Sequence, residues 1–314
     1  MVVNGFVRDS FLLSNMADIK LFNIKEDVRE YQSSTVALEK ELQTIIENNM
    51  DTFFGVRFLA SEFRTSDGGR MDSIGIDENH CPVIFEYKRS IKDNVINQGL
   101  FYLNWLLDHK DSFKVLVIEK LGLKAAEDID WSMPRVICVA GDFTKYDESA
   151  IKQMNRNISL IRYKKFGDDL LMFEQINENV ATSAEDGHQS SSGKNKSQQK
   201  TFLERKKEAP APLLTIYEDV RNYILSLGDD ITENQLKYYI AFKKIKNIVC
   251  IEILKSTIVL RLKLDVSTVA FEKGFSRDTS NVGHYGTGDV EVVLSTAKDF
   301  EKAKPLLDRA YDEN

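Results

Sequence analysis

The feature that most constrains this chain is a break in composition over residues 177–212. Apolar residues nearly vanish there, Ser, Gln, Lys, Asn and Glu take their place, and two prolines close the stretch. Such a segment cannot bury enough apolar surface to offset its ordering entropy, so it predicts a flexible linker. Its lysines and arginines suggest a nucleic-acid-binding arm as the alternative, but neighbouring glutamates dilute the charge and favour the linker. The chain is therefore expected to divide into residues 1–176 and residues 213–314.

Composition places both parts among ordinary globular domains. The 314 residues are 42% hydrophobic and 29% charged, enough for two cores, and no apolar run is long enough for a transmembrane helix. The N-terminus lacks the basic and then apolar pattern of a secretory signal, and three distant cysteines suit a reducing compartment. We therefore expect a cytoplasmic protein with no membrane association. Four histidines without Cys/His pairs at ligand spacing argue against structural zinc.

The net charge limits the kind of nucleic-acid partner. With 42 Lys and Arg against 49 Asp and Glu, the formal charge is −7, which argues against a protein that coats nucleic acid through bulk charge. A local basic groove around a site that acts on one phosphodiester is compatible with this balance.

Residues 1–176 alternate helical and extended patterns, which predicts a mixed α/β domain. An amphipathic helix is expected over 36–48, with Leu38, Leu42, Ile45 and Ile46 on one face, and a second helix over 95–109. Strands are predicted over 58–63, 70–77, 82–88, 115–118, 136–139, 158–162 and 170–173.

Residues 213–314 predict a smaller α+β domain. Helical spacing covers 216–227 and 297–311, and strands are expected over 238–243, 248–253, 258–264 and 290–294.

The residues that suggest chemistry lie on two neighbouring strands. Asp72 stands near the start of one predicted strand, and Glu86 and Lys88 end the next. Side chains two apart on a strand share a face, so Glu86 and Lys88 project together, and a short connection through 78–80 brings Asp72 beside Glu86. Two adjacent carboxylates repel one another, and a hard cation such as Mg²⁺ relieves that repulsion. Taken alone, this pattern is more often a surface ion pair.

The surrounding residues change that balance. The apolar strand Val83–Phe85 precedes Glu86-x-Lys88, Gln98 and Tyr102 follow at helical spacing, and Glu39 lies on the first helix with Glu41 as the reserve. Together they resemble the PD-(D/E)XK nuclease superfamily, most closely its NucS-like and RecB-like branches, over about residues 35–175. The resemblance implies a restriction-endonuclease-like mixed sheet flanked by helices. The chain shows no N-terminal partner domain like that of the archaeal mismatch nucleases, so their DNA-structure preference is not carried over.

The resemblance also implies roles for these residues. Asp72, Glu86 and Glu39 would hold Mg²⁺ or Mn²⁺, Lys88 would position the attacking water, and Gln98 and Tyr102 would orient the lysine and the scissile phosphate. The expected activity is a deoxyribonuclease, endonuclease rather than exonuclease, acting on DNA that includes branched or single-stranded forms, and a homodimer is one expected state. Phosphate contacts are expected from Arg57, Arg64, Arg70, Arg89 and Lys92.

The second part carries one notable loop. Its glycine-rich run includes Gly283, His284, Gly286, Thr287 and Gly288. Backbone N–H groups of such a run can cradle an anion, but a tight turn before the strand at 290–294 is favoured. The whole segment resembles a domain of unknown function, sometimes labelled "predicted transport protein", that follows such nuclease-like domains. Its ligand or protein partner is unknown.

Two alternatives to a nuclease stay open. One is a non-catalytic nucleic-acid-binding or regulatory protein on a nuclease scaffold. The other is a cytosolic accessory protein that binds a small ligand at the His284 loop.

Overall fold

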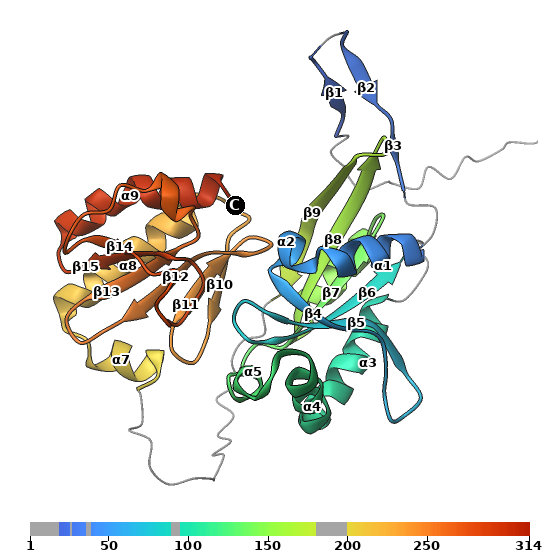
Figure 1. The fold of residues 1–314 in the computed structure, drawn as a ribbon, viewed down its shortest axis with the longest axis horizontal. Helices are drawn as coiled ribbons and strands as arrows, with labels where there is room; N and C mark the ends of the chain where they lie inside the picture. Colours follow the sequence, from blue (N-terminus) through green and yellow to red (C-terminus); the bar gives the residue numbers. More distant parts are fainter. Residues whose placement is uncertain (1–18, 26, 36–38, 89–94, 180–199) are drawn as a thin grey trace, which may run out of the picture.

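The computed structural model describes residues 19–25, 27–35, 39–88, 95–179 and 200–314, and these form two domains, each built on one β-sheet (Figure 1). A two-stranded arm, β1 (Leu21–Asn23) and β2 (Arg29–Tyr31), projects from the first domain. None of the helices in the described ranges is both long and apolar enough to cross a membrane.

The first domain is built on a seven-stranded mixed sheet, in the order β3-β8-β7-β6-β5-β4 with β9 beside β8. Strand β6 is parallel to β7 and β7 to β8, whereas the other neighbours are antiparallel. The strands span Ser33–Ser34 (β3), Val56–Arg64 (β4), Arg70–Asp77 (β5), Pro82–Lys88 (β6), Arg135–Ala140 (β7), Asn157–Phe166 (β8) and Leu170–Asn179 (β9).

Helices cover both faces of this sheet, which confirms the predicted mixed sheet flanked by helices. One face packs on α1 (Glu39–Asn48) and α2 (Met50–Phe54) through a core that includes Leu42, Phe85 and Tyr87. The other face packs on α3 (Val95–Asp108), α4 (Lys110–Leu121), α5 (Leu123–Glu127) and α6 (Lys145–Lys152). Ile84 belongs to this second core, so alternate residues of β6 serve the two faces.

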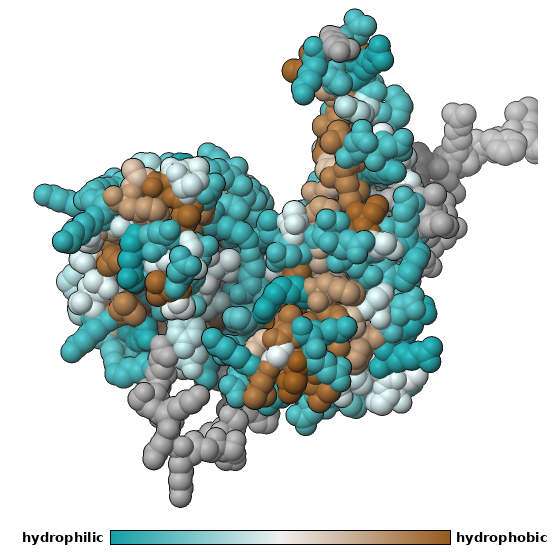
Figure 2. Space-filling view, in the orientation of Figure 1, coloured by the Kyte–Doolittle hydropathy of each residue, from teal (hydrophilic) through white to brown (hydrophobic). Residues whose placement is uncertain are grey.

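The strand predicted over 115–118 is wrong, because these residues lie within α4. A short run of apolar residues does not distinguish a strand from a helix, and here Leu116 and Val117 are buried while Val115 is 54% exposed. Figure 2 shows the result as an apolar patch over α4 and α5, where Val115, Ile118 and Leu123 are exposed.

The second domain is a six-stranded antiparallel sheet in the order β10-β11-β12-β13-β15-β14. Three helices pack against one of its faces in a single core. The elements span Phe202–Glu208 (α7), Ala211–Ser226 (α8), Thr232–Gln235 (β10), Ile240–Lys243 (β11), Asn247–Ile253 (β12), Ile258–Leu262 (β13), Ser276–Asp278 (β14), Val290–Leu294 (β15) and Ala297–Asp312 (α9).

The predicted linker is too long at both ends. Strand β9 continues to Asn179, and α7 begins inside the stretch because Thr201 accepts a hydrogen bond from the Glu204 backbone N–H and Phe202 is buried. Residues 180–199, the centre of the predicted linker, lie outside the described residues.

Candidate nuclease site

The structure brings Asp72 and Glu86 together at the predicted place. Asp72 lies on β5 and Glu86 on β6, one residue beyond the paired residues Ser73 and Phe85. The Asp72 backbone N–H donates to Glu86 Oε1 at 3.3 Å, and the Tyr87 backbone N–H donates to Asp72 Oδ2 at 3.0 Å. Each strand's backbone therefore holds the other strand's carboxyl group.

Burial and charge make Glu86 an unusual acid. Its side chain is fully buried, and its Oε2 atom has no hydrogen-bond partner. Burial, with Asp72 second, raises the pKa of Glu86 to about 9, and burial also raises the pKa of Asp72. Because the pKa of Glu86 is raised to about 9, the pair holds a proton at neutral pH when no cation is bound.

Lys88 supplies the nearby positive charge. It ends β6 on the same face as Glu86 and is partly buried. Its charge acts on both carboxyl groups, lowering the pKa of each against the effect of burial. The predicted grouping of Asp72, Glu86 and Lys88 is thus present in the structure.

Helix α3 covers this face and carries the next two predicted residues. Tyr102 is buried, and its hydroxyl accepts a hydrogen bond of 3.1 Å from the Arg70 backbone N–H. It thereby fixes the start of β5, two residues before Asp72. Gln98 lies one helical turn earlier and is partly buried. The proposed contacts of these two side chains with the lysine and a phosphate stay predictions.

Glu39 does not complete an acidic cluster with the pair. Among the described residues, no three His, Cys, Asp or Glu side chains lie close enough to hold a metal ion together. The reason is the layering: α1 packs on the Phe85 and Tyr87 face of the sheet, whereas Glu86 shares the face of Ile84. Glu39 begins α1 and is partly buried, and the reserve residue Glu41 is exposed.

Helix α1 instead contributes two residues that the sequence analysis missed. The Gln43 side-chain amide donates to the Asp72 carbonyl at 2.8 Å and to Glu47 Oε1 at 2.8 Å. Ser73 Oγ donates to the same Glu47 oxygen at 2.6 Å, and the Tyr87 hydroxyl donates to Ser73 Oγ at 3.1 Å. We call Gln43, Glu47, Ser73 and Tyr87 the support network.

A signal for part of this network exists in the sequence. Gln43 and Glu47 are spaced by four, directly beside the apolar residues Leu42 and Ile46, so they border the buried face of α1. Polar residues at that border point to a hydrogen-bonded partner in the core, but the partner's identity depends on the strand pairing.

The predicted phosphate-contacting cations are dispersed. Arg64 and Arg70 face one another across β4 and β5, and both are exposed at the Asp72 end of the sheet. Arg57 pairs with Ile76 near the other end of β4, so it lies away from the carboxyl pair, and its contact with a phosphate stays a prediction. Arg89 and Lys92 lie outside the described residues.

The glycine-rich loop of the second domain folds against its own sheet. A Cβ on Gly286 would lie 2.6 Å from the Cys250 Cβ, and one on Gly288 would lie 2.5 Å from the Leu262 carbonyl. Both glycines have positive φ, of 78° and 110°. The Thr287 backbone N–H donates to Cys250 Sγ at 3.3 Å rather than pointing at a ligand. Close packing and positive φ therefore explain why glycine occupies positions 286 and 288, as expected for a tight turn.

The same loop also lines a cavity of about 410 Å³ between the two domains. His284, whose Nε2 lies 3.7 Å from Asp289 Oδ1, and Gly288 line it from the loop, with Lys263 beside them. Arg57 and His80 line it from the first domain. Gly283 differs from the two packed glycines, because a Cβ at this position would meet no described atom within 4 Å.

The Asp72 and Glu86 pair fits a hard divalent cation. The partnerless Glu86 Oε2 atom is buried, and carboxylate oxygens are the ligands that Mg²⁺ and Mn²⁺ prefer. A cation would replace the proton that the pair otherwise shares, which removes the cost of burying two like charges.

Two solved structures resemble part of the chain. A repair endonuclease from Pyrococcus abyssi is 21% identical, with a TM-score of 0.28 over 41% of this chain and 49% of that chain. A structure of an EndoMS–dsDNA complex is 20% identical, with a TM-score of 0.25 over 41% of this chain and 47% of that chain. The matched part spans about half the length of each of these chains.

Sequence comparisons cover more of the chain. Residues 201–314 match the domain of unknown function DUF5655, which agrees with the expected uncharacterised C-terminal domain. An uncharacterized protein from Haemophilus influenzae is 30% identical over 303 residues, which cover 93% of this chain and 99% of that protein. Because this likeness extends over nearly all of both proteins, the chain belongs to the same family as the Haemophilus influenzae protein.

Proposed function

We propose that this protein is a metal-dependent nuclease that hydrolyses DNA phosphodiester bonds at the Asp72, Glu86 and Lys88 site. The observation that carries the proposal is the buried Glu86 carboxyl group, which lies against Asp72 with one oxygen unpartnered. Burying two adjacent carboxyl groups costs free energy, and a structure that retains such a pair beside a lysine has the features of a site rather than of a core.

Each residue has a defined task in this proposal. Asp72 and Glu86 would hold Mg²⁺ or Mn²⁺, which when bound supplies an activated water and neutralises charge on the phosphate. Lys88 would donate hydrogen bonds to the attacking water and offset the charge that develops on the phosphorus oxygens. Arg64 and Arg70, exposed at the same end of the sheet, would contact flanking phosphates.

A cleavage assay tests this function directly. Single-stranded, duplex and branched DNAs are incubated with Mg²⁺ or Mn²⁺ and either the parent protein, Lys88→Ala or Lys120→Ala. Lys120 is an exposed residue of α4 and serves as the matched control. We expect the parent and Lys120→Ala to cut at equal rates, and Lys88→Ala to lose about 100-fold or more in rate.

Two outcomes would contradict the proposal. One is cleavage by Lys88→Ala at the parental rate, with its fold verified by circular dichroism. The other is DNA binding without metal-dependent cleavage by the parent, which is the behaviour of a non-catalytic binding protein.

A further inference from the structure

The second domain leaves one face of its sheet without helices, and the first domain contacts part of that face. Along β11, Ile240 and Phe242 belong to the core beneath the helices, whereas Ala241 between them belongs to a different cluster. That cluster joins Ala241, Cys250 and Tyr239 to Cys81 of the first domain. This second face also carries the buried residues Glu252, Arg261 and Glu291, which form ion pairs within the second domain. It is thus polar as well as apolar, and its contacts with the first domain include Cys81.

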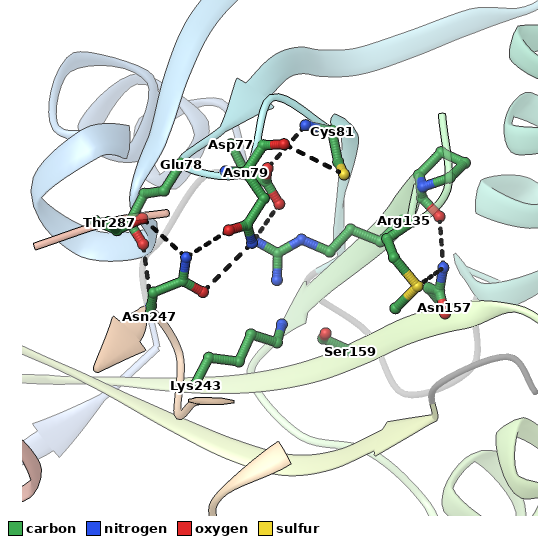
Figure 3. Close-up of polar contacts among 12 residues, drawn as sticks. Asp77, Glu78, Asn79, Cys81, Arg135, Asn157, Ser159, Lys243, Asn247 and Thr287 are labelled. Carbon is green, nitrogen blue, oxygen red and sulfur yellow. Dashed lines mark hydrogen bonds and ion pairs between the residues drawn. The ribbon is translucent and has the colours of Figure 1, made fainter. Parts of the chain in front are cut away.

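Polar contacts give this interface a fixed geometry. Figure 3 shows Asn247, at the start of β12, between the two domains: its side-chain amide donates to Asn79 Oδ1 at 2.7 Å, and its backbone N–H donates to Glu78 Oε2 at 3.0 Å. The Tyr239 hydroxyl donates to the same Asn79 oxygen at 2.9 Å, and Lys263 pairs with Glu78. The turn between β5 and β6 is thus held by Asn247 of β12, by Tyr239 just before β11 and by Lys263 just after β13.

A buried ion pair crosses the interface at its other side. Lys243 Nζ lies 2.6 Å from Glu178 Oε1, with the two side chains only 3% and 5% exposed. The other Glu178 oxygen accepts a hydrogen bond of 2.8 Å from the Thr232 hydroxyl. Burial disfavours the charged form of both Lys243 and Glu178. At Glu178, the positive charges of Lys243 and Arg135 exceed this effect, so the pKa of Glu178 is lowered. Nearby, Arg135 pairs with Asp77 at 3.4 Å, so the buried charges balance.

The two strands that carry the candidate site reach this interface at the opposite end from the site, β5 at its last residue and β6 at its first. Strand β6 begins at Pro82, next to the interface residue Cys81, and ends at Lys88. At about 3.3 Å per residue, the interface lies roughly 20 Å from the candidate site. Arg135, at the start of β7, and Asp77, at the end of β5, are locked at the same end of the sheet.

We propose that the surface formed by the turn at residues 77–81, Arg135 and Glu178 is a permanent docking site for the domain of residues 201–314. The β11–β12 hairpin is the part that docks, and the association does not depend on the segment that connects the domains. The domain thereby clamps the end of β5 and the starts of β6 and β7. This inference goes beyond the proposed function and does not rest on it.

The test cuts the connection in the full chain. A specific protease sequence is inserted between residues 180 and 199, the purified protein is cleaved, and the two fragments are analysed by size-exclusion chromatography at micromolar concentration. The variants are Lys243→Met and the matched control Lys244→Met. Lys244, the next residue, contacts Asp230 and the Tyr311 carbonyl within its own domain.

We expect the cleaved parent and Lys244→Met fragments to elute together, and the Lys243→Met fragments to associate at least 100-fold more weakly, because Glu178 is left buried without its cation. The double variant Lys243→Met/Glu178→Met should regain most of the affinity, which separates loss of the pair from misfolding. Fragments of the parent that separate, or equal affinities of Lys243→Met and Lys244→Met, would overturn the proposal.

A measurement on the uncut chain gives an independent check. Hydrogen exchange of the turn at residues 77–81 should be equally slow in the parent and in Lys244→Met, and faster in Lys243→Met. Equal exchange in all three proteins would also count against permanent docking through this pair.

Discussion

At Glu86, burial conflicts with the charge that a carboxyl group normally carries at neutral pH. Its carboxyl group is fully buried between two strands and lies against a second carboxyl group. A purely structural site would favour Gln or an apolar residue there, because neither needs a partner for a charge. The raised pKa, to about 9, measures this conflict in the absence of a cation.

The raised pKa of Glu86 predicts that the metal-free protein loses stability as the pH rises. The pKa of Glu86 in the folded protein, about 9, lies above the ordinary value of 4.5 expected in the unfolded chain. The stabilising effect of the protonated group is therefore complete below about pH 4.5 and is lost as pH rises toward 9. Between these pH values, the contribution of Glu86 to the free energy of unfolding falls by at most about 1.4 kcal/mol per pH unit.

Urea unfolding in EDTA between pH 5 and pH 9 measures this slope in the parent and in Glu86→Gln. The glutamine has no proton to lose, so we expect the free energy of unfolding of Glu86→Gln to exceed that of the parent increasingly as pH rises. A difference between the two proteins that is independent of pH would show that Glu86 is not protonated in the folded state.

At the scale of elements, α1 fixes β5 and β6 from the face opposite the carboxyl pair. Glu47 accepts hydrogen bonds from Gln43 at 2.8 Å and from Ser73 at 2.6 Å, and Gln43 also holds the Asp72 carbonyl. These contacts set the position of Asp72 although none of them reaches its carboxylate. Such positioning groups commonly change metal affinity by 10-fold to 100-fold, a rough general range.

We therefore expect Glu47→Ala to weaken Mn²⁺ binding by about 10-fold or more while the protein stays folded. Glu41→Ala is the matched control, because Glu41 is exposed on the same helix. Glu47→Gln, which keeps an acceptor oxygen, should recover part of the affinity. Mn²⁺ titrations followed by electron paramagnetic resonance give these affinities, and equal values for Glu47→Ala and Glu41→Ala would argue against the support network.

The elements around the site were largely predictable from the sequence. The strands predicted over 70–77 and 82–88 have the observed bounds of β5 and β6, because alternation and the Gly-Gly lead-in are local signals. Helix α3 was predicted to within one residue. The meeting of Asp72 with Glu86 then followed from the geometry of a hairpin.

Other features depend on contacts between distant parts of the chain. Whether Glu39 reaches the carboxyl pair depends on which face of the sheet α1 covers. The local sequence pattern of the helix does not predict that face. The burial of Lys243 and Glu178 requires both domains to be in place, so each residue is interpreted from the sequence as an ordinary solvated charge. The helix at Val115 was missed because four apolar residues suit either structure.

At the scale of the molecule, the two sheets share one buried polar interface at the end of β6 remote from Lys88. The DUF5655 domain therefore does not surround the candidate site, and it leaves the opposite end of the first sheet, with Arg64 and Arg70, for the DNA contacts that we propose. In our two proposals, DNA recognition and hydrolysis belong to the first domain, and the second domain clamps the sheet of the first.

The measurement that tests this account most directly is calorimetric titration of the metal-free protein with Mn²⁺ at pH 7, in two buffers of different ionisation enthalpy. We predict binding by the parent with release of about one proton per ion, because the cation replaces the proton shared by Asp72 and Glu86. Affinity should rise with pH up to about 9, and Glu86→Gln should lose the binding. Failure of the parent to bind Mn²⁺, or equal binding by Glu86→Gln, would contradict the account.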